Sequence, residues 1–429
     1  MKINKYRIKK KFKEPKFLIK FIIVSLAVLT FLVLFVFTNI RFLGVKSANE
    51  GARRYQSRSC LAFYPNTENG RQKAKDMCKE APNNSMFDYA LVPYGDYYLV
   101  EYGNGTNYYI NKVTSEEIKI DSISEEGIKI ISDYLRYEMK KDEIDEAYTL
   151  EFIEDTKPSN ININECEYKV NGKYLDVYFP KYDYVTHVPL MYMQKEANIN
   201  LGYDDELYVK PRYISSRRKI VAFTFDDGPN GEVSKKIIDY LYDYDAVGTF
   251  FVQGINLYSS NVDLIKDSIS KGNQYGSHTQ DHADLNKLSS NEIYNEIIGP
   301  VNDLLNGYHA NSKYDFDAIG YEMKIYRPPY GNHNDYVDSV APLIAITWDC
   351  DSNDWKYRDA QLDAGEVLNF ESMKTLDGKI VLFHDLYNET AQAMEILIPK
   401  LISKGYQFVT VDDILESKEI SHDSTFYPW

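Results

Sequence analysis

Residues 220–229 read IVAFTFDDGP, and the second half of the chain is best understood from this stretch. Its apolar start is typical of a buried strand, and the glycine and proline at its end stop the strand and turn the chain. Asp226 and Asp227 therefore come at the carboxyl end of a strand, where α/β folds carry their reactive groups. Two adjacent carboxylates repel each other, so we expect one to bind a cation and the other to handle protons. Taken alone, the stretch also fits an acidic turn.

From about residue 218 the sequence alternates between apolar runs of strand length and helical patterns. Ser289 and Glu292 form a capping box before one apolar helical series, and a second helical pattern over 390–404 ends before Gly405. Such alternation favours an α/β fold with a parallel sheet, which we expect to curl into a barrel. The strands are expected at 219–225, 247–253, 273–277, 323–327, 343–349, 378–383 and 407–411.

A second polar segment, HTQDH at 278–282, contains two of the seven histidines of the chain. His278 and His282 are four residues apart, a spacing that places two imidazoles on one face of a helix. With one aspartate they would make a set of two histidines and one carboxylate, which leaves positions for water and substrate. Such a set is typical of a catalytic metal site. The pair alone would also fit an ordinary helix surface.

Three further polar segments follow predicted strands. In RPPYG at 327–331 the prolines stiffen the backbone and so fix where the arginine points and where the tyrosine amide faces. The segment 348–355, WDCDSNDW, brings acids and two tryptophans to the end of a strand, and IVLFHD at 380–385 leaves His384 at the rim. Each of these segments alone would also fit a rigid loop or a core position.

Together, TFDDGP, HTQDH, RPPYG, DSNDW and LFHD resemble the five ordered signature motifs of the polysaccharide deacetylase family, carbohydrate esterase family 4, with its NodB-like domain. The resemblance covers roughly residues 218–420 and shows no substitution at a position that carries chemistry. It implies a catalytic domain with a distorted (β/α)7 barrel, which agrees with the number of predicted strands.

The resemblance implies a role for each matching residue. Asp227, His278 and His282 would hold a divalent metal, with Zn2+ expected first and Co2+, Ni2+ or Mn2+ as alternatives. Such a metal lowers the pKa of bound water and polarises the acetyl carbonyl.

The catalytic roles implied by the resemblance fall on five residues. Asp226 would be the general base, oriented and kept ionised by Arg327, and the backbone N–H of Tyr330 would help to bind the oxyanion. His384 would be the general acid that protonates the departing amine, and Asp351 would keep that imidazole protonated through its negative charge. The pocket for the acetyl methyl group would be lined by Trp355 and Leu382.

Charge is distributed unevenly along the chain. Of the 49 basic and 64 acidic residues, eleven basic residues and one acidic residue lie within 1–46. The rest of the chain is therefore strongly acidic, which argues against a nucleic-acid partner, since binding to phosphate backbones depends on lysine and arginine.

The basic N-terminus precedes an apolar run. Residues 21–40 carry no charge and are long enough to cross the hydrocarbon core of a membrane as a helix. The basic flank at 1–20 predicts a cytoplasmic N-terminus and an external chain after about residue 41. A cleaved signal peptide is the alternative, but its apolar region is shorter and no small-residue cleavage site follows here. We expect a single-pass membrane anchor with the catalytic domain on the cell-wall side.

Between anchor and catalytic domain, residues 47–205 are predicted to form one or two small α+β accessory units without a visible site. Over 42–114 we expect short strands and turns, and over 115–140 an amphipathic helix. Among the four cysteines, Cys60 and Cys78 are the expected disulfide pair and Cys350 an expected buried thiol. Further strands are expected around 148–153, 166–170 and 174–179.

An outward-facing, membrane-tethered domain of this kind points to a glycan of the cell envelope. The favoured function is metal-dependent deacetylation of N-acetylglucosamine in peptidoglycan, with release of acetate. The alternatives are deacetylation of chitin-like or exopolysaccharide glycans, removal of O-acetyl groups from xylan, and a glycan-binding pseudoenzyme. The motifs do not separate the glycans, because specificity lies in the loops between strands. The complete metal set, base and acid argue against the pseudoenzyme.

Overall fold

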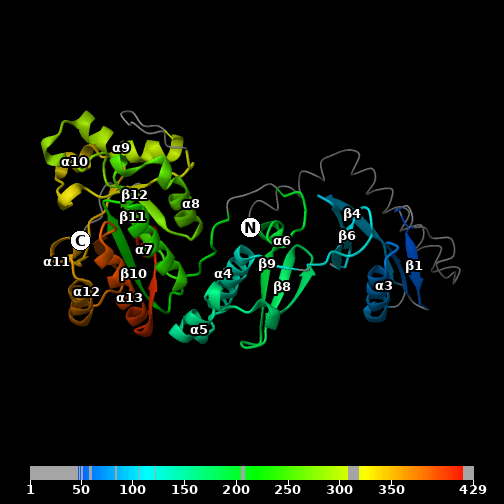
Figure 1. The fold of residues 1–429 in the computed structure, drawn as a ribbon. Coiled ribbons are helices and arrows are strands. Elements are labelled where there is room, and N and C mark those ends of the chain that lie inside the picture. The colour runs from blue at the N-terminus through cyan, green and yellow to red at the C-terminus, as the bar shows by residue number, and fades with distance from the viewer. Residues whose placement is uncertain are drawn as a thin grey trace. The chain divides into compact units, whose positions relative to one another are not determined.

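The computed structural model describes the chain between residues 47 and 418, with internal gaps (Figure 1). The predicted anchor at 21–40 lies outside the described residues and stays a prediction. Among the residues that are described, no helix combines the length and the apolar composition needed to span a membrane. The described residues are 47, 49, 52–57, 60–82, 85–104, 106–120, 122–203, 208–307 and 318–418.

Backbone contacts divide the chain into two compact units. The first comprises the described residues up to Lys119 together with Asn200–Gly202, and the second comprises Ile120–Ile199 and the described residues from Tyr203 onward. Residues of the predicted accessory region, 47–205, therefore belong to both units.

The described residues of the first unit form two small sheets and a helix. The Tyr-rich segment forms an antiparallel meander in which β5 pairs with both of its neighbours, so the expected short strands and turns are confirmed there. In the other sheet β2 is buried along its whole length and pairs with β1 and β3. The elements are β1 (Arg53–Gln56), β2 (Cys60–Tyr64), α3 (Glu68–Glu80), β3 (Ser85–Phe87), β4 (Tyr89–Tyr94), β5 (Tyr97–Tyr102) and β6 (Asn107–Asn111).

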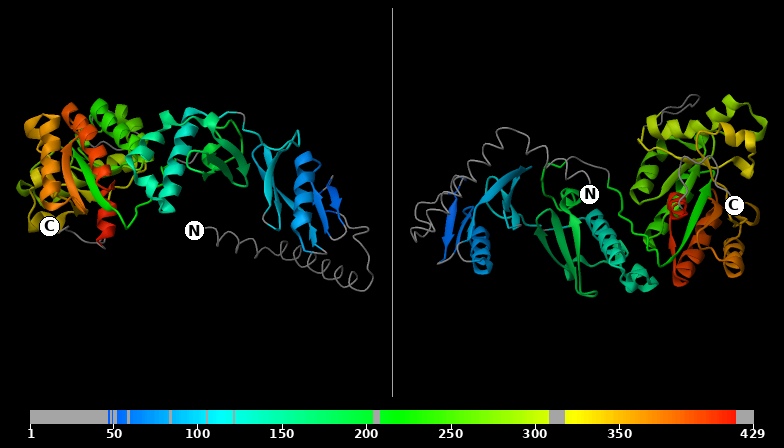
Figure 2. Two further views of the ribbon diagram at one scale, coloured as in Figure 1. Left: turned by 90° about the horizontal axis from the view of Figure 1, so that it is seen from below. Right: turned by 180° about the vertical axis from the view of Figure 1, so that it is seen from behind.

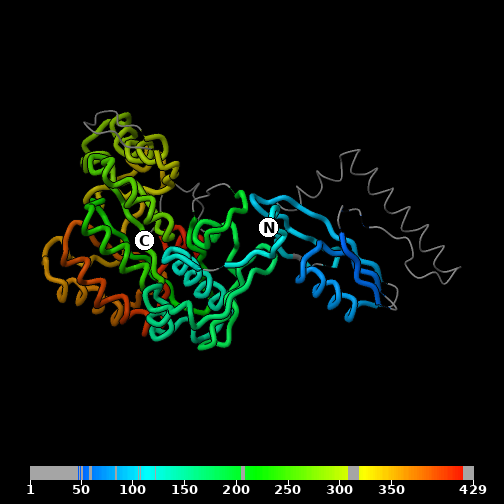
Figure 3. Tube along the Cα trace, turned by 45° about the vertical axis from the view of Figure 1, so that its right-hand side comes forward, coloured from blue at the N-terminus to red at the C-terminus, as the bar shows by residue number. Residues whose placement is uncertain are grey.

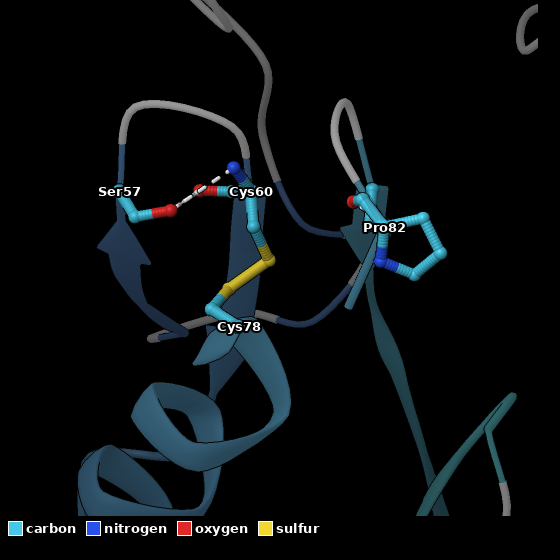
Figure 4. The surroundings of a disulfide bond; sticks show 5 residues. Ser57, Cys60, Cys78 and Pro82 are labelled. Atoms are coloured by element: carbon cyan, nitrogen blue, oxygen red, sulfur yellow. Dashed lines mark hydrogen bonds between the residues drawn. A yellow bond between two sulfur atoms is a disulfide. The ribbon is translucent and has the colours of Figure 1, made fainter. Parts of the chain in front are cut away.

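A disulfide joins Cys60 on β2 to Cys78 on α3 (Figure 4), which confirms the expected pair. Cys350 is a free, buried thiol, also as expected. Helix α3 itself was not expected. Its sequence is mostly polar, and the apolar residues that it buries, Ala74 and Met77 beside Cys78, are too few to mark a helical period.

The second unit begins with helix α4, which confirms the amphipathic pattern over 115–140, and continues with an antiparallel three-stranded sheet. The strand expected at 148–153 is wrong: the hydroxyl of Thr149 accepts a hydrogen bond from the Phe152 N–H and so starts a helix there. The elements are α4 (Glu125–Lys141), α5 (Leu150–Asp155), β7 (Glu167–Asn171), β8 (Tyr174–Phe179), β9 (Tyr184–Pro189) and α6 (Leu190–Met193).

The buried side chain of Arg136 attaches α4 to the catalytic part of the same unit. Its guanidinium donates to the carbonyls of Tyr242 and Asp243, at the end of helix α7 (Gly231–Asp243), and to that of Ile153. A guanidinium there satisfies carbonyls that a helix end leaves without partners. Residues 120–199 are thus packed as part of the catalytic unit.

The remaining strands form one parallel sheet, in which β10 has three neighbours; β10, β11 and β12 are labelled in Figure 1. Strand β10 pairs with β11 on one side and with β16 and β17 on the other; the register between β10 and β16 sets Asp226 beside His384. These two strands are more than 150 residues apart in sequence and run side by side (Figure 3). The strands are β10 (Lys219–Asp226), β11 (Gly248–Val252), β12 (Gln274–Ser277), β13 (Ile325–Tyr326), β14 (Ile344–Ala345), β15 (Cys350–Asp351), β16 (Lys379–His384) and β17 (Tyr406–Phe408).

The sheet is curled, because its two edges are joined by a very short segment. Strands β14 and β15 lie at opposite edges, yet only residues 346–349 connect them, and four residues reach at most roughly 15 Å. The single strand expected at 343–349 is therefore split into two, and the sheet has eight strands instead of seven. A curled parallel sheet agrees with the expected (β/α)7 fold, although within the described residues no strand pairing joins the two edges.

Helices surround the sheet (Figure 2). The capping box of Ser289 and Glu292 is confirmed at the start of α9, and the helix expected over 390–404 is confirmed as α13. The helices after α7 are α8 (Val262–Ser270), α9 (Ser290–Asn306), α10 (Asp335–Val340), α11 (Asp354–Tyr357), α12 (Ala360–Lys374), α13 (Asn388–Ser403) and α14 (Val411–Ser417).

Candidate active site

The polar ends of the motifs meet at the carboxyl edge of the parallel sheet. Asp226 ends β10 and is paired in register with His384, which ends β16. His278 directly follows β12, and Arg327 directly follows β13. Because parallel strands all end at the same edge, residues that are far apart in sequence are brought to one place.

Asp227, His278 and His282 form a group that could hold a metal ion. One ligand atom from each lies within 4.8 Å of the others. The Oδ1 atom of Asp227 is 3.4 Å from the Nε2 atom of each histidine. Two ligand atoms around a tetrahedral zinc ion are separated by roughly 3.4 Å, so carboxylate and imidazoles are spaced to share one ion. The ligand set predicted from the sequence is brought together.

The expectation that 278–282 is helical is wrong. The segment is a turn, in which Thr279 and His282 have positive φ angles of 67° and 64°. The Thr279 hydroxyl accepts a hydrogen bond from the His282 N–H at 3.1 Å. The two imidazoles still meet, with ring centroids 4.9 Å apart, because the turn folds the chain back on itself.

A carboxylate outside the motifs holds this turn. Glu296 on α9 accepts hydrogen bonds from the backbone N–H groups of Gln280 and Asp281, at 3.0 and 3.2 Å. The Gln280 side chain lies against Gly254 and Gly299, where an added Cβ would be 2.1 Å from its Oε1 atom. The turn is therefore positioned by neighbouring elements before a metal binds. No sequence signal marked Glu296, which looks like an ordinary residue of an amphipathic helix.

The hydrogen bonds of the ligands suit metal binding. His278 Nδ1 donates to the carbonyl of Arg327 at 2.9 Å, which leaves Nε2 unprotonated for a metal. Burial and the charge of His278 lower the pKa of His282, which favours the neutral, ligating form. When no metal is bound and His278 carries a proton on both ring nitrogens, burial raises the pKa of Asp227, but the hydrogen bond and charge of His278 outweigh it and leave that pKa below its usual range.

Two amides following β11 orient Asp227. Gln253 Nε2 donates to Asp227 Oδ1 at 2.5 Å, and Asn256 Nδ2 donates to its backbone carbonyl at 2.8 Å. Asp227 itself has a positive φ of 74°, a conformation that needs such support. Both amides were missed from the sequence; their position just after a predicted strand was the one available signal.

Asp226 and Arg327 form a buried ion pair, as predicted. Arg327 Nη1 donates to Asp226 Oδ1 at 2.8 Å and to the hydroxyl of Thr224 at 2.7 Å. The Oδ2 atom of Asp226 is 3.7 Å from His278 Nε2, so this oxygen faces the metal ligands. The guanidinium of Arg327, a permanent cation, therefore lies directly against the carboxylate that is predicted to be the general base.

The predicted pairing of Asp351 with His384 is wrong, and Asp354 takes that place. The Nδ1 atom of His384 lies 2.8 Å from Asp354 Oδ1, and the His384 N–H donates to Asp354 Oδ2 at 2.7 Å. Asp351 instead accepts hydrogen bonds from the Asn353 N–H and, at 3.5 Å, from the indole N–H of Trp355. Both acids belong to one motif, and α11 begins at the second of them, which turns Asp354 toward β16.

The environment of His384 favours its protonated form. Burial lowers its pKa, but the hydrogen bond and charge of Asp354, with the charges of Asp226 and Asp227, raise the pKa to about 9. The imidazole is therefore protonated at neutral pH and loses its proton as the pH rises through that value. A cation bound by Asp227 would lower this pKa, because it would cancel part of the negative charge.

The remaining predicted residues lie around this centre. Tyr330 has a positive φ of 61°, and its exposed ring is 4.6 Å from that of His282. Trp355 is half-exposed, and Leu382 is buried in β16, two residues before His384 and thus on the same face of the strand. The roles of the Tyr330 N–H and of the methyl pocket stay predictions.

Comparisons with known proteins find relatives for the second half of the chain. The family model described as polysaccharide deacetylase matches residues 214–347. A peptidoglycan-N-acetylglucosamine deacetylase of Listeria monocytogenes is 36% identical, over 52% of this chain and 47% of the relative. A peptidoglycan-N-acetylmuramic acid deacetylase of Bacillus subtilis is 33% identical, over 49% of this chain and 42% of the relative. A peptidoglycan-N-acetylglucosamine deacetylase of Bacillus cereus is 30% identical, over 48% of this chain and 92% of the relative. The chain thus spans less than half the length of the first two relatives and nearly all of the third.

Replacing Asp354 should change the titration of His384. In the metal-free protein, Asp354→Asn removes the negative charge that holds the proton, so we expect the His384 pKa to fall by about one to three units. Nuclear magnetic resonance of the imidazole at a series of pH values measures the pKa of His384. Asp351→Asn is the matched control and should shift this pKa much less. An equal or larger shift in Asp351→Asn would restore Asp351 as the partner.

Replacing either histidine ligand should empty the metal site. His278→Ala or His282→Ala removes one of three protein ligands, so we expect bound zinc to be lost on dialysis, as measured by metal analysis of the purified protein. His333→Ala changes a histidine that pairs with Asp338 and should keep the metal. Asp226→Asn should also keep it, because its oxygens are not among the three ligand atoms. Undiminished zinc in either ligand variant would rule the site out.

Proposed function

Because this chain belongs to the polysaccharide deacetylase family, we propose that it hydrolyses the N-acetyl group of N-acetylglucosamine residues in peptidoglycan. The products are acetate and a free amine on the sugar. The observation that carries the proposal is the arrangement of three separate groups at one edge of the sheet. These groups are a candidate metal triad, a carboxylate paired with a buried arginine, and a protonated histidine.

Two side chains of the protein carry out the two proton transfers: Asp226 accepts a proton and His384 donates one. A divalent metal held by Asp227, His278 and His282, proposed to be zinc with cobalt, nickel or manganese as alternatives, would supply positive charge that acidifies water and polarises the acetyl carbonyl. Asp226 takes the proton from the attacking water, and the hydrogen bond from Arg327 orients its carboxylate.

His384 acts on the leaving group of the reaction. As the C–N bond breaks, the protonated imidazole gives its proton to the nitrogen, and Asp354 holds the imidazole in that form and orientation. The Tyr330 N–H donates to the oxygen on which negative charge develops. Trp355 and Leu382 enclose the acetyl methyl group.

The choice of peptidoglycan as substrate is supported by the relatives. Two of them are peptidoglycan-N-acetylglucosamine deacetylases and one is a peptidoglycan-N-acetylmuramic acid deacetylase. Chitin-like glycans, exopolysaccharides and O-acetylated xylan are the alternative substrates. The intact base, acid and ligand set weigh against a pseudoenzyme that only binds glycans.

We also propose that residues 21–40 anchor the protein in the cell membrane with the catalytic domain on the cell-wall side. The uncharged run and its basic flank support this topology. The Cys60–Cys78 disulfide adds independent support, because such bonds persist in oxidising surroundings outside the cytoplasm.

Acetate release from purified peptidoglycan tests the function and the role of His384 together. The metal-loaded wild type should release acetate and create free amines on glucosamine. His384→Ala should lower this turnover by roughly 10²–10⁴-fold, because an amide nitrogen needs a proton to leave. An aryl acetate should be affected much less, since its leaving group departs as a stable anion. Equal losses on both substrates would show that His384 does not protonate the leaving group, and absence of acetate from the wild type would reject the function.

Protease accessibility tests the topology. In wall-stripped intact cells, added protease should digest the chain beyond about residue 47, because that part lies outside, while the anchor segment remains with the membrane fraction. Immunoblotting with one antibody against the N-terminal segment and another against the catalytic domain follows the two parts separately. A mature form that begins near Ser47 and is recovered from the medium would contradict the anchor.

A further inference from the structure

Arg358 stands beside the proposed active site in a fixed position. It directly follows α11, the helix that carries Asp354 and Trp355, and its Nε donates to the carbonyl of Trp355 at 3.1 Å. Its guanidinium carbon lies 3.1 Å from the centre of the Tyr387 ring. The Tyr387 ring is in turn 6.2 Å from the imidazole of His384. A single tyrosine ring thus separates Arg358 from the proposed proton donor.

Among the described residues of the catalytic part, no carboxylate forms an ion pair with Arg358. Within 208–307 and 318–418, each of the other four arginines pairs with a carboxylate at 2.5 to 2.8 Å, and Arg358 does not. The side chain is exposed, and in the same described ranges its guanidinium makes its one hydrogen bond through Nε. Its two terminal nitrogens are therefore available to a ligand. The arginines with partners are Arg212, Arg217, Arg218 and Arg327.

The geometry also prepares Arg358 for one kind of ligand. A guanidinium that stacks on an aromatic ring still presents the N–H groups in its plane, and these match the two oxygens of a carboxylate. Stacking on Tyr387 and bonding to Trp355 restrict the side chain in advance, so less conformational entropy is lost on binding. The chain has a net charge of −15, and Arg358 places an exposed positive charge at the rim of the proposed active site.

Carboxylates distinguish the candidate glycans from one another. The repeating units of chitin and of acetylated xylan carry none. In peptidoglycan, every second sugar bears a lactyl ether whose carboxyl group is either free or extended by a peptide that has carboxylates of its own. With an N-acetylglucosamine at His384, the substituent of the adjacent sugar is the nearest source of such a group.

We propose that Arg358 is a specificity residue that binds a carboxylate on the sugar next to the one being deacetylated. It thereby favours peptidoglycan over uncharged glycans that carry the same N-acetyl group. The inference rests on the proposed function, because it requires a glycan in the site. It adds a binding contact that none of the five motifs contains.

The test compares kcat/KM for acetate release on three substrates with the metal-loaded full chain. These are peptide-bearing peptidoglycan fragments, the same glycan after its peptides are removed by an amidase, and a chito-oligosaccharide of equal length. In Arg358→Gln, the ratio of kcat/KM on a carboxylate-bearing substrate to that on the neutral one should fall roughly tenfold, which is the size expected of one hydrogen-bonded charge at a partly exposed site. The loss should lie mainly in KM and shrink at high salt, since it reflects binding between charges.

Lys356→Gln is the matched control. Lys356 lies on α11, two residues before Arg358, is exposed, and has its ammonium 5.0 Å from the centre of the Tyr357 ring instead of beside Tyr387. The Lys356→Gln substitution removes one positive charge, as Arg358→Gln does. We expect it to leave the ratio of kcat/KM between charged and neutral substrates within about twofold of the wild type. Arg358→Lys keeps the charge without the planar fork and should give an intermediate ratio.

The possible outcomes distinguish failure of the proposed role of Arg358 from failure of the proposed deacetylase function. A fall confined to the peptide-bearing substrate identifies a peptide carboxylate. A fall confined to the amidase-treated glycan identifies the lactyl carboxylate, which the amidase sets free, and a fall on both charged substrates shows that Arg358 binds either carboxylate. An unchanged ratio in Arg358→Gln, or an equal fall in Lys356→Gln, overturns the inference and leaves the deacetylase function standing. A wild type that releases acetate from none of the three substrates overturns the function and the inference with it.

Discussion

The buried ion pair between Arg327 and Asp226 connects the parts of the molecule on which the active site depends. The guanidinium donates to Thr224 and Asp226 on β10, and to the carbonyls of Ile346 and Thr347. Those two carbonyls belong to the segment that crosses between the edges of the sheet. One side chain therefore links the curl of the sheet to the proposed general base. A fully buried arginine is tolerated because these acceptors replace the water that it loses.

Three aspartates of the proposed active site have different partners and therefore different proposed roles. Asp226 faces a permanent cation, Asp227 faces two imidazoles at ligand spacing, and Asp354 holds the imidazole of His384. With separate partners, the groups that accept and donate protons can coexist at one pH.

Much of the catalytic fold could be predicted, because buried parallel strands are apolar runs that end in polar residues. The run before Asp226 and the run before His384 illustrate this. Prediction failed where a short element has no such pattern. Helix α3 is mostly polar, α5 begins at a threonine cap within a strand-like sequence, and β14 and β15 are two residues each. Their existence depends on what packs against them, which local sequence does not contain.

The residue types and spacing of the motifs determined, without any structure, that the chain carries a carboxylate pair, two histidines at ligand spacing, an arginine and a terminal histidine. The packing of separate elements determined which of them meet. Asp351 and Asp354 are equivalent in the sequence, but α11 directs only Asp354 to His384. Glu296 lies on α9, outside the motifs, and reaches the 278–282 turn only in the folded structure. The reason is physical: spacing along the chain constrains side chains within one element, whereas contacts between elements follow from strand register and from the curl of the sheet.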